Sequence, residues 1–183
     1  MKKTTVINLF AGPGVGKSTI AAGIFYELKC KGISCELSGE VAKDKVWENN
    51  TEALLDQPYI FGKQQHRIRR LYGKVDYIIA DSPILLSIAY SHEDSKNFND
   101  YIIEQHNKYT SINFYIERNL YKEGYEQIGR VQSLSESTQK DNDIIKILHN
   151  YNISYEYVTG SNSKDIVNQI LNIIDNKQKN GMS

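Results

Sequence analysis

Net charge, a cysteine pattern and long apolar runs are all missing from this sequence, and each absence excludes a class of protein. The 22 basic and 22 acidic residues cancel, so no overall field predicts attraction to nucleic acid or to an anionic membrane. Cys30 and Cys35 are the two cysteines. Because no other Cys or His stands at ligand spacing from them, we expect two reduced thiols rather than a metal site or a disulfide framework.

Leader segments and internal repeats are missing as well. The apolar stretch that follows Met1-Lys2-Lys3 breaks after about six residues, which is too short for a signal-peptide core or a membrane span. We therefore expect a protein of the cytoplasm that does not attach to membranes. A chain of 183 residues without repeats is long enough to bury one substantial core, so we predict a single domain over residues 1–176 and a flexible tail over 177–183.

What the sequence does contain is an alternation of short apolar segments with segments of helical pattern. Strands are expected at 4–10, 33–37, 75–80, 112–116 and 154–158. Helices are expected at 18–31, 57–72, 83–90 and 98–109. Two further helices are expected to extend to about residues 150 and 174. Such alternation predicts an α/β fold in three layers, with a mainly parallel five-stranded sheet covered by helices on both faces. In these sheets the carboxyl ends of the strands form the edge where ligands bind.

A glycine-rich loop follows the first strand and carries the most specific motif. The segment AGPGVGKST, residues 11–19, is a Walker A motif with Ala11 in place of the usual first glycine. Glycines let backbone N–H groups converge on phosphate oxygens, and the N-terminus of the next helix adds positive potential there. A chance glycine-rich turn would lack the strand, the lysine, the hydroxyl and the helix that surround this one. The loop therefore predicts an ATP site formed by Gly12, Pro13, Gly14, Val15, Gly16, Lys17, Ser18 and Thr19.

Individual side chains of the loop and of two strand ends have predicted roles in that site. Lys17 should reach the β- and γ-phosphates, and Ser18 should ligate Mg²⁺. Asp81 ends a buried apolar run, as the metal-linked carboxylate of a Walker B segment does, although Asp is also a common helix N-cap. Glu40 follows the second strand, where a carboxylate can take a proton from an acceptor hydroxyl; an exposed turn glutamate is the alternative.

A polar segment flanked by two arginines and a predicted helix with a basic face complete the set of candidates. Arg118 and Arg130 flank a polar segment, residues 117–135, which we interpret as a lid whose guanidinium groups would neutralise a phosphoryl group in transfer. His66, Arg69 and Arg70 share one face of a predicted helix that could hold an anionic acceptor, a nucleotide or a nucleic acid backbone. In both regions, ordinary solvated surface residues are the alternative.

With these residues placed, the chain resembles the P-loop kinases of nucleosides and nucleotides. It is most similar to the small nicotinamide-riboside-kinase-like "AAA domain" proteins of large tailed bacteriophages. The matching segments are AGPGVGKST, LSGEVAK, VDYIIADSP, FYIERN, IGRVQ and YVTGSNSKD. The resemblance implies that Glu40 is a general base and that Thr159, Gly160 and Ser161 lie against the adenine. It also implies an action in the host-cell cytoplasm.

The departures from that family leave the acceptor open. Asp81 is followed by Ser82-Pro83, where many such kinases have an arginine that would contact phosphate. Segments that would indicate an adenylate kinase or a regulatory GTPase are absent. We therefore expect an ATP- and Mg²⁺-dependent phosphotransferase whose acceptor is a nucleoside, a nucleotide or a modified base in DNA. The alternatives are an ATPase that couples hydrolysis to a partner and a regulatory module without turnover. The sequence does not reveal the oligomeric state.

Overall fold

A computed structural model describes residues 2–91, 96–118 and 134–179. The strands are Thr5–Phe10 (β1), Cys35–Ser38 (β2), Tyr77–Ala80 (β3), Ser111–Ile116 (β4) and Glu156–Val158 (β5). The helices of the described ranges are Lys17–Cys30 (α1), Val41–Trp47 (α2), Glu52–Leu55 (α3), Gln57–Arg69 (α4), Leu86–Tyr90 (α5), Lys96–His106 (α6), Leu134–Asn150 (α7) and Ser163–Lys179 (α8).

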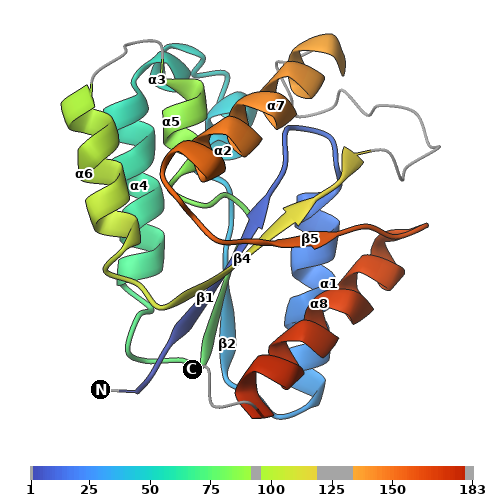
Figure 1. The fold of residues 1–183 in the computed structure, drawn as a ribbon. Coiled ribbons are helices and arrows are strands. Elements are labelled where there is room, and N and C mark those ends of the chain that lie inside the picture. The colour runs from blue at the N-terminus through green and yellow to red at the C-terminus, as the bar shows by residue number, and fades with distance from the viewer. Residues whose placement is uncertain (1, 92–95, 119–133, 180–183) are drawn as a thin grey trace.

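The described strands form one parallel sheet in the order β2-β3-β1-β4-β5, with β1 at its centre (Figure 1). In this register Asn8 of β1 lies between Ala80 of β3 and Asn113 of β4. Because the strands all run in one direction, the segments that follow them meet at one edge. That edge carries the glycine-rich loop after β1, Glu40 after β2, Asp81 after β3, and the turn after β5.

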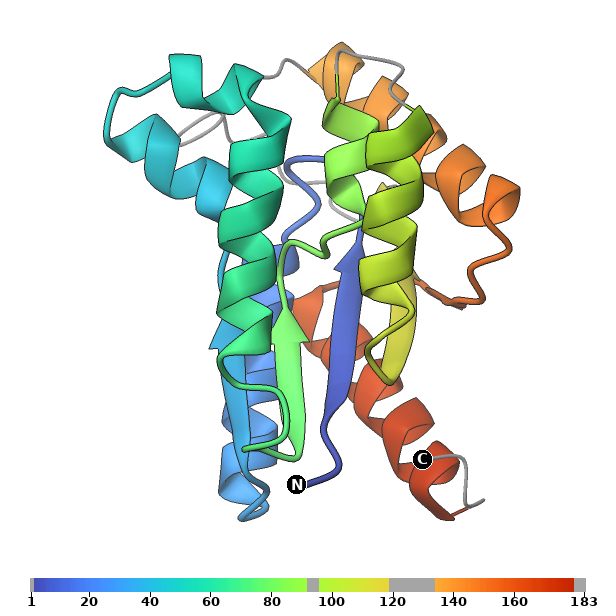
Figure 2. The same ribbon diagram turned by 90° about the vertical axis from the view of Figure 1, so that its left-hand side faces the viewer.

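Two layers of helices cover the sheet because side chains of the strands alternate between its faces. Ile7 and Leu9 pack in the core formed with α1 and α8, whereas Val6 and Phe10 pack in the core formed with α4, α5, α6 and α7. Figure 2 looks onto the second layer, with α4, α5 and α6 in front of the strands. None of the helices in the described ranges combines the length and apolarity that a membrane span requires.

Segments between the strands differ in detail from the sequence-based expectation. Residues 41–56, which have no clear pattern, contain the short helices α2 and α3. Helix α8 continues through Lys179 and so includes the first residues of the expected tail 177–183. Of the expected lid, 117–135, residues 119–133 lie outside the described ranges, and α7 begins at Leu134. Helix α4 begins as expected after Asp56, whose side chain accepts a hydrogen bond from the Tyr59 amide at 3.0 Å.

Candidate active site

The loop between β1 and α1 has the backbone geometry that a phosphate-binding loop requires. Gly14 and Gly16 have φ angles of 85° and 92°, a left-handed conformation that glycine adopts without strain. Gly16 is the N-cap of α1, so the positive end of that helix points into the loop. The Lys17 ammonium folds back over the loop and donates to the carbonyls of Ala11, at 2.9 Å, and Gly12, at 3.0 Å.

Ser18 and Asp81 meet beside this loop. The Ser18 hydroxyl donates to Asp81 Oδ2 at 2.6 Å, and the Asp81 backbone amide donates to the Ser38 carbonyl of the neighbouring strand at 3.2 Å. Asp81 is only 6% exposed, and its Oδ1 has no hydrogen-bond partner among the described residues. It does not cap α5, since the N-cap of that helix is Leu85. The helix-cap alternative for Asp81 is therefore wrong.

The oxygen atoms of this pair suit a hard cation such as Mg²⁺. Mg²⁺ prefers oxygen ligands and is commonly held by one or two protein oxygens together with substrate phosphates. The Ser18 hydroxyl and the unpartnered Asp81 Oδ1 provide such oxygens next to the loop. The described residues contain no group of three or more His, Cys, Asp or Glu side chains that could hold a metal by themselves, so a cation here would also need ligands from the phosphates.

Glu40 lies at the same edge of the sheet, as the N-cap residue of α2. Its side chain is half-buried, which differs from the exposed turn glutamate of the alternative interpretation. The backbone around it is held by the buried side chain of Gln64 in α4. Gln64 Nε2 donates to Ser38 Oγ at 3.1 Å and to the Gly39 carbonyl at 3.0 Å, and Gln64 Oε1 accepts from the Val41 amide at 3.1 Å. Sequence reasoning missed Gln64.

Arg118 is the second residue after β4 and is paired within the protein. Its Nε donates to Asp141 Oδ2, and its Nη2 donates to the Ser137 carbonyl of α7 at 3.2 Å. Asp141 Oδ1 also accepts the Gly12 amide hydrogen at 2.6 Å. The structure therefore places Arg118 beside the glycine-rich loop, but it pairs with a carboxylate that the sequence analysis did not single out. Arg130, the other predicted lid arginine, lies outside the described residues.

The turn after β5 lies at the same edge and is tied to neighbouring elements. Thr159 Oγ1 donates to Glu117 Oε2 at 3.0 Å, and Ser161 N donates to Asp165 Oδ2 at 3.2 Å. A Cβ at Gly160 would lie 3.0 Å from side-chain atoms of α8, so the backbone packs closely there. The position of these residues is compatible with the predicted adenine contact, which stays a prediction.

The basic residues of α4 line a hollow between α2 and α4. This groove has a volume of about 440 Å³, and its lining includes Gly39 and Val41, the neighbours of Glu40, as well as the acidic residues Asp44 and Glu48. Its basic lining comes from Lys45 of α2 and from one face of α4, which carries Lys63, His66, Arg67 and Arg70. We call these four α4 residues the basic face. Arg69, expected on the same face as His66 and Arg70, is not part of the groove.

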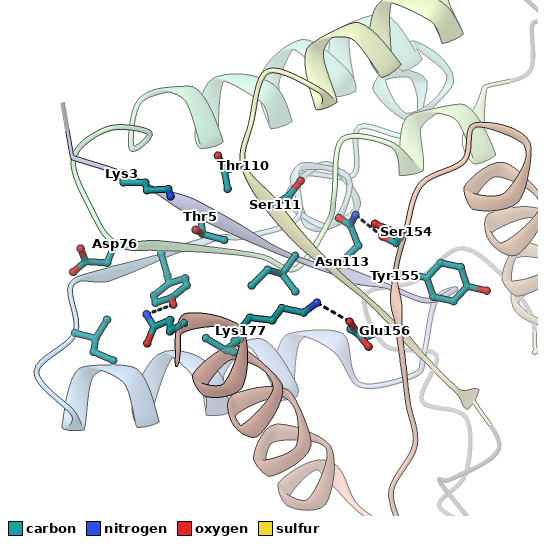
Figure 3. Close-up of a pocket in the computed structure, with 15 residues that line it drawn as sticks. Lys3, Thr5, Asp76, Thr110, Ser111, Asn113, Ser154, Tyr155, Glu156 and Lys177 are labelled. Atoms are coloured by element: carbon teal, nitrogen blue, oxygen red, sulfur yellow. Dashed lines mark hydrogen bonds and ion pairs between the residues drawn. The ribbon is translucent and has the colours of Figure 1, made fainter. Parts of the chain in front are cut away.

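A second hollow, of about 540 Å³, opens at the amino ends of the strands (Figure 3). Its polar groups are largely paired within the protein. Lys177 of α8 pairs with Glu156 at 2.8 Å, and Asn113 Nδ2 donates to the Ser154 carbonyl at 2.9 Å. The glycine-rich loop lines neither hollow, so the larger cavity lies at the opposite end of the sheet from the candidate site.

Comparison with known proteins identifies the fold. No protein-family model and no curated protein matches the chain in sequence. Among solved structures, deoxyadenosine kinase from M. mycoides, with dCMP and a flexible dCDP bound, is similar at 16% identity and a TM-score of 0.57, over 94% of this chain and 100% of that one. Shikimate kinase from Acinetobacter baumannii in complex with shikimate is similar at 17% identity and a TM-score of 0.52, over 96% of both chains. The predicted fold class, the three-layer α/β fold of P-loop kinases, is confirmed.

Proposed function

We propose that this chain is a phosphotransferase that uses ATP and Mg²⁺ and moves the γ-phosphate to a nucleoside, a nucleotide or a modified base. The observation that carries the proposal is the contact between Ser18 and Asp81 beside the loop. That contact brings the hydroxyl of the predicted Walker A motif to the carboxylate of the predicted Walker B segment, and the carboxylate keeps one buried oxygen unpartnered. A regulatory GTPase would carry further signature segments, which are absent from the sequence.

The residues of the loop and of the β2 and β3 ends have distinct tasks in this proposal. The loop amides and Lys17 bind the donor phosphates, while Ser18 and Asp81 hold Mg²⁺, which neutralises charge on the phosphates when bound. Glu40 accepts the proton of the attacking hydroxyl, and Gln64 keeps the backbone around Glu40 in place. Lys17 can leave its two carbonyl contacts because these are hydrogen bonds to neutral groups, whereas a phosphate offers a full charge.

The acceptor remains the open part of the proposal because the fold does not choose it. The two similar structures are named for kinases of deoxyadenosine and of shikimate, which are very different molecules. Arg67 and Lys45 of the groove pair with Asp44 and Glu48. The other basic residues that line the groove, Lys63, His66 and Arg70, favour an acceptor that carries a phosphate, as a nucleotide or a nucleic acid does. We propose a small nucleotide-like acceptor first, and a modified base in DNA as the polymer alternative. We further propose that the protein acts in the cytoplasm, where its two free cysteines stay reduced.

A transfer assay tests the proposal. The protein is incubated with Mg²⁺ and γ-labelled ATP in the presence of nucleosides, nucleoside monophosphates, nicotinamide riboside or DNA with hydroxymethylated bases. Label that moves to one acceptor, and that is lost in Lys17→Ala, would support the phosphotransferase. Release of inorganic phosphate that is independent of every acceptor but rises with a partner protein would instead support the ATPase.

A further inference from the structure

The peptide unit between Ala11 and Gly12 is held from both sides. Its carbonyl oxygen accepts a hydrogen bond from the Lys17 ammonium at 2.9 Å. Its N–H group, on Gly12, donates to Asp141 Oδ1 at 2.6 Å. Because a peptide unit is planar and rigid, the carboxylate that orients the N–H also orients the carbonyl. Asp141 of α7 is thereby connected to Lys17 through a single peptide plane.

The charge of Asp141 would oppose a triphosphate unless another charge cancelled it. Asp141 and Arg118 have side chains only 10% and 16% exposed, so little water screens them. Arg118 Nε donates to Asp141 Oδ2, and Arg118 Nη2 donates to the Ser137 carbonyl. The guanidinium therefore sits against the carboxylate that touches the loop. Without Arg118, a buried negative charge would remain next to the site for the donor phosphates.

Close packing leaves little freedom for this arrangement to change. A Cβ at Gly12 would lie 2.6 Å from both Asp141 Oδ1 and the Ser137 carbonyl, and 2.8 Å from Arg118 Nη2. Contacts that short do not occur in real structures, so α7 and the loop approach each other as closely as a glycine allows. This packing adds to the hydrogen bonds and indicates that α7 supports the loop.

We propose that Asp141 is a positioning residue of the donor site. It orients the Ala11–Gly12 peptide, and through it the Lys17 ammonium in the nucleotide-free protein, while Arg118 cancels its charge so that a triphosphate can approach. This inference rests on the proposed function and deepens it. It assigns Arg118 to the support of the loop, whereas a lid arginine would touch the phosphates directly, and the two roles predict different results.

A double-mutant cycle separates the two roles of Arg118. Affinity for a non-hydrolysable ATP analogue with Mg²⁺ is measured by calorimetry for Arg118→Met, for Asp141→Asn and for the double variant. Arg118→Met should weaken binding about tenfold in the wild-type background and less than about threefold in the Asp141→Asn background, because residues in contact are not additive. The KM for ATP should rise more than kcat falls. An equal loss in both backgrounds would mean that Arg118 binds phosphate itself, and would overturn the inference.

A measurement on the nucleotide-free protein tests the loop without relying on ATP binding. In Asp141→Ala, hydrogen exchange of the Gly12 amide and modification of Lys17 by an amine-reactive reagent should both accelerate about tenfold. Asp143→Asn is the matched control, since Asp143 is a more exposed α7 carboxylate that pairs with Lys140 at 3.8 Å. Thermal denaturation checks that each variant is folded. Unchanged exchange and unchanged Lys17 reactivity would overturn the inference.

The two proposals fail in different ways. A wild-type protein that binds no triphosphate, but whose Gly12 exchange and Lys17 reactivity depend on Asp141, would contradict the proposed function and support the positioning role. If the wild-type protein and all of the variants bound ATP equally well, the result would support the proposed function and contradict the positioning role.

Discussion

The two ends of the sheet differ in how their polar groups are satisfied. At the amino end lies the larger hollow, about 540 Å³, but charged residues that line it have partners within the protein, for example Lys177 with Glu156 and Asp76 with Lys2. At the carboxyl end, Asp81 keeps a buried oxygen that no described residue satisfies. A buried polar atom without a partner is rare in native structures and calls for an explanation, whereas a hollow does not. Here the lack of a hydrogen-bond partner for a buried atom, rather than the volume of a hollow, indicates which end of the sheet is functional.

Replacing Asp81 should have the largest effect on turnover. Asp81→Asn keeps the shape of the side chain but removes the charge that would hold Mg²⁺ with Ser18. We expect kcat/KM to fall by about 10²–10³, the usual loss when a well-placed electrostatic group is removed. Urea unfolding should show no loss of stability, because the variant removes a buried charge rather than a packed group. Wild-type activity in Asp81→Asn would contradict the assignment of the carboxyl end of the sheet as the functional end.

Replacing Glu40 should have the next largest effect and should act on the chemical step. For Glu40→Gln we expect kcat to fall by about 10², within the range for loss of a general base, with affinity for ATP changed less than about twofold. Glu36→Gln is the matched control, because Glu36 lies in the preceding strand β2 but pairs with Lys29 at the surface. Undiminished transfer by Glu40→Gln would remove Glu40 from the mechanism.

Neutralising the basic face should have a moderate effect that depends on the acceptor. The triple variant Lys63→Gln, His66→Gln and Arg70→Gln removes three side chains that line the groove. None of the three forms an ion pair with another described residue. The KM for a phosphate-bearing acceptor should rise about tenfold, with a weaker salt dependence.

A neutral nucleoside and a control variant sharpen this prediction. The triple variant should leave the KM for a neutral nucleoside unchanged, because no phosphate would occupy the groove. Arg69→Gln, a basic residue of the same helix outside the groove, should leave the KM for both kinds of acceptor unchanged. If Arg69→Gln and the triple variant behaved alike, the groove would have no role in acceptor binding.

His106 gives the smallest expected effect on turnover and a clear effect on stability. It lies at the end of α6, shortly before the amino end of β4, and its burial lowers the pKa of the imidazole from 6.5 to about 4. Between these values the unfolded chain binds the proton and the folded protein does not. The unfolding free energy should therefore be complete above pH 6.5 and decrease as the pH falls to 4, by up to about 3 kcal/mol.

Two variants isolate that contribution. Urea unfolding of His106→Gln should show a shallower decrease in stability between pH 6.5 and 4 than the wild type. Its kcat at neutral pH should stay within about twofold. His149→Gln is the control, because His149 is exposed. An identical pH dependence in His106→Gln and in the wild type would show that His106 is not the group responsible.

Much of the candidate site at the carboxyl end of the sheet could be predicted from the sequence, because each of its segments is short and continuous in the chain. The loop at 11–19 is continuous in the chain, and Glu40 and Asp81 each follow a strand whose apolar run predicts it. Parallel strands then bring the residues after them to one edge, as the rule for such sheets predicts. The short helices α2 and α3 were harder to predict because so few residues give no clear helical period.

The supports of the site could not be predicted, because they depend on tertiary packing. Asp141 contacts Gly12 across 129 positions of sequence, and Gln64 contacts Gly39 across 25. No pattern within a helix indicates which of its polar residues will meet a distant loop. The basic helix shows the same limit, since its periodicity identifies residues that share a face but not which of them line a groove, and Arg69 does not line this one.

The central claim is that the loop after β1 binds a nucleoside triphosphate, and calorimetry with MgATP tests it most directly. We predict binding by the wild-type protein and a loss of affinity of at least about 100-fold in Lys17→Ala, with wild-type affinity in Lys43→Ala, a lysine of α2 outside the loop. A wild-type protein that gives no heat with any purine triphosphate, or a Lys17→Ala variant that binds as well as the wild type, would contradict the account.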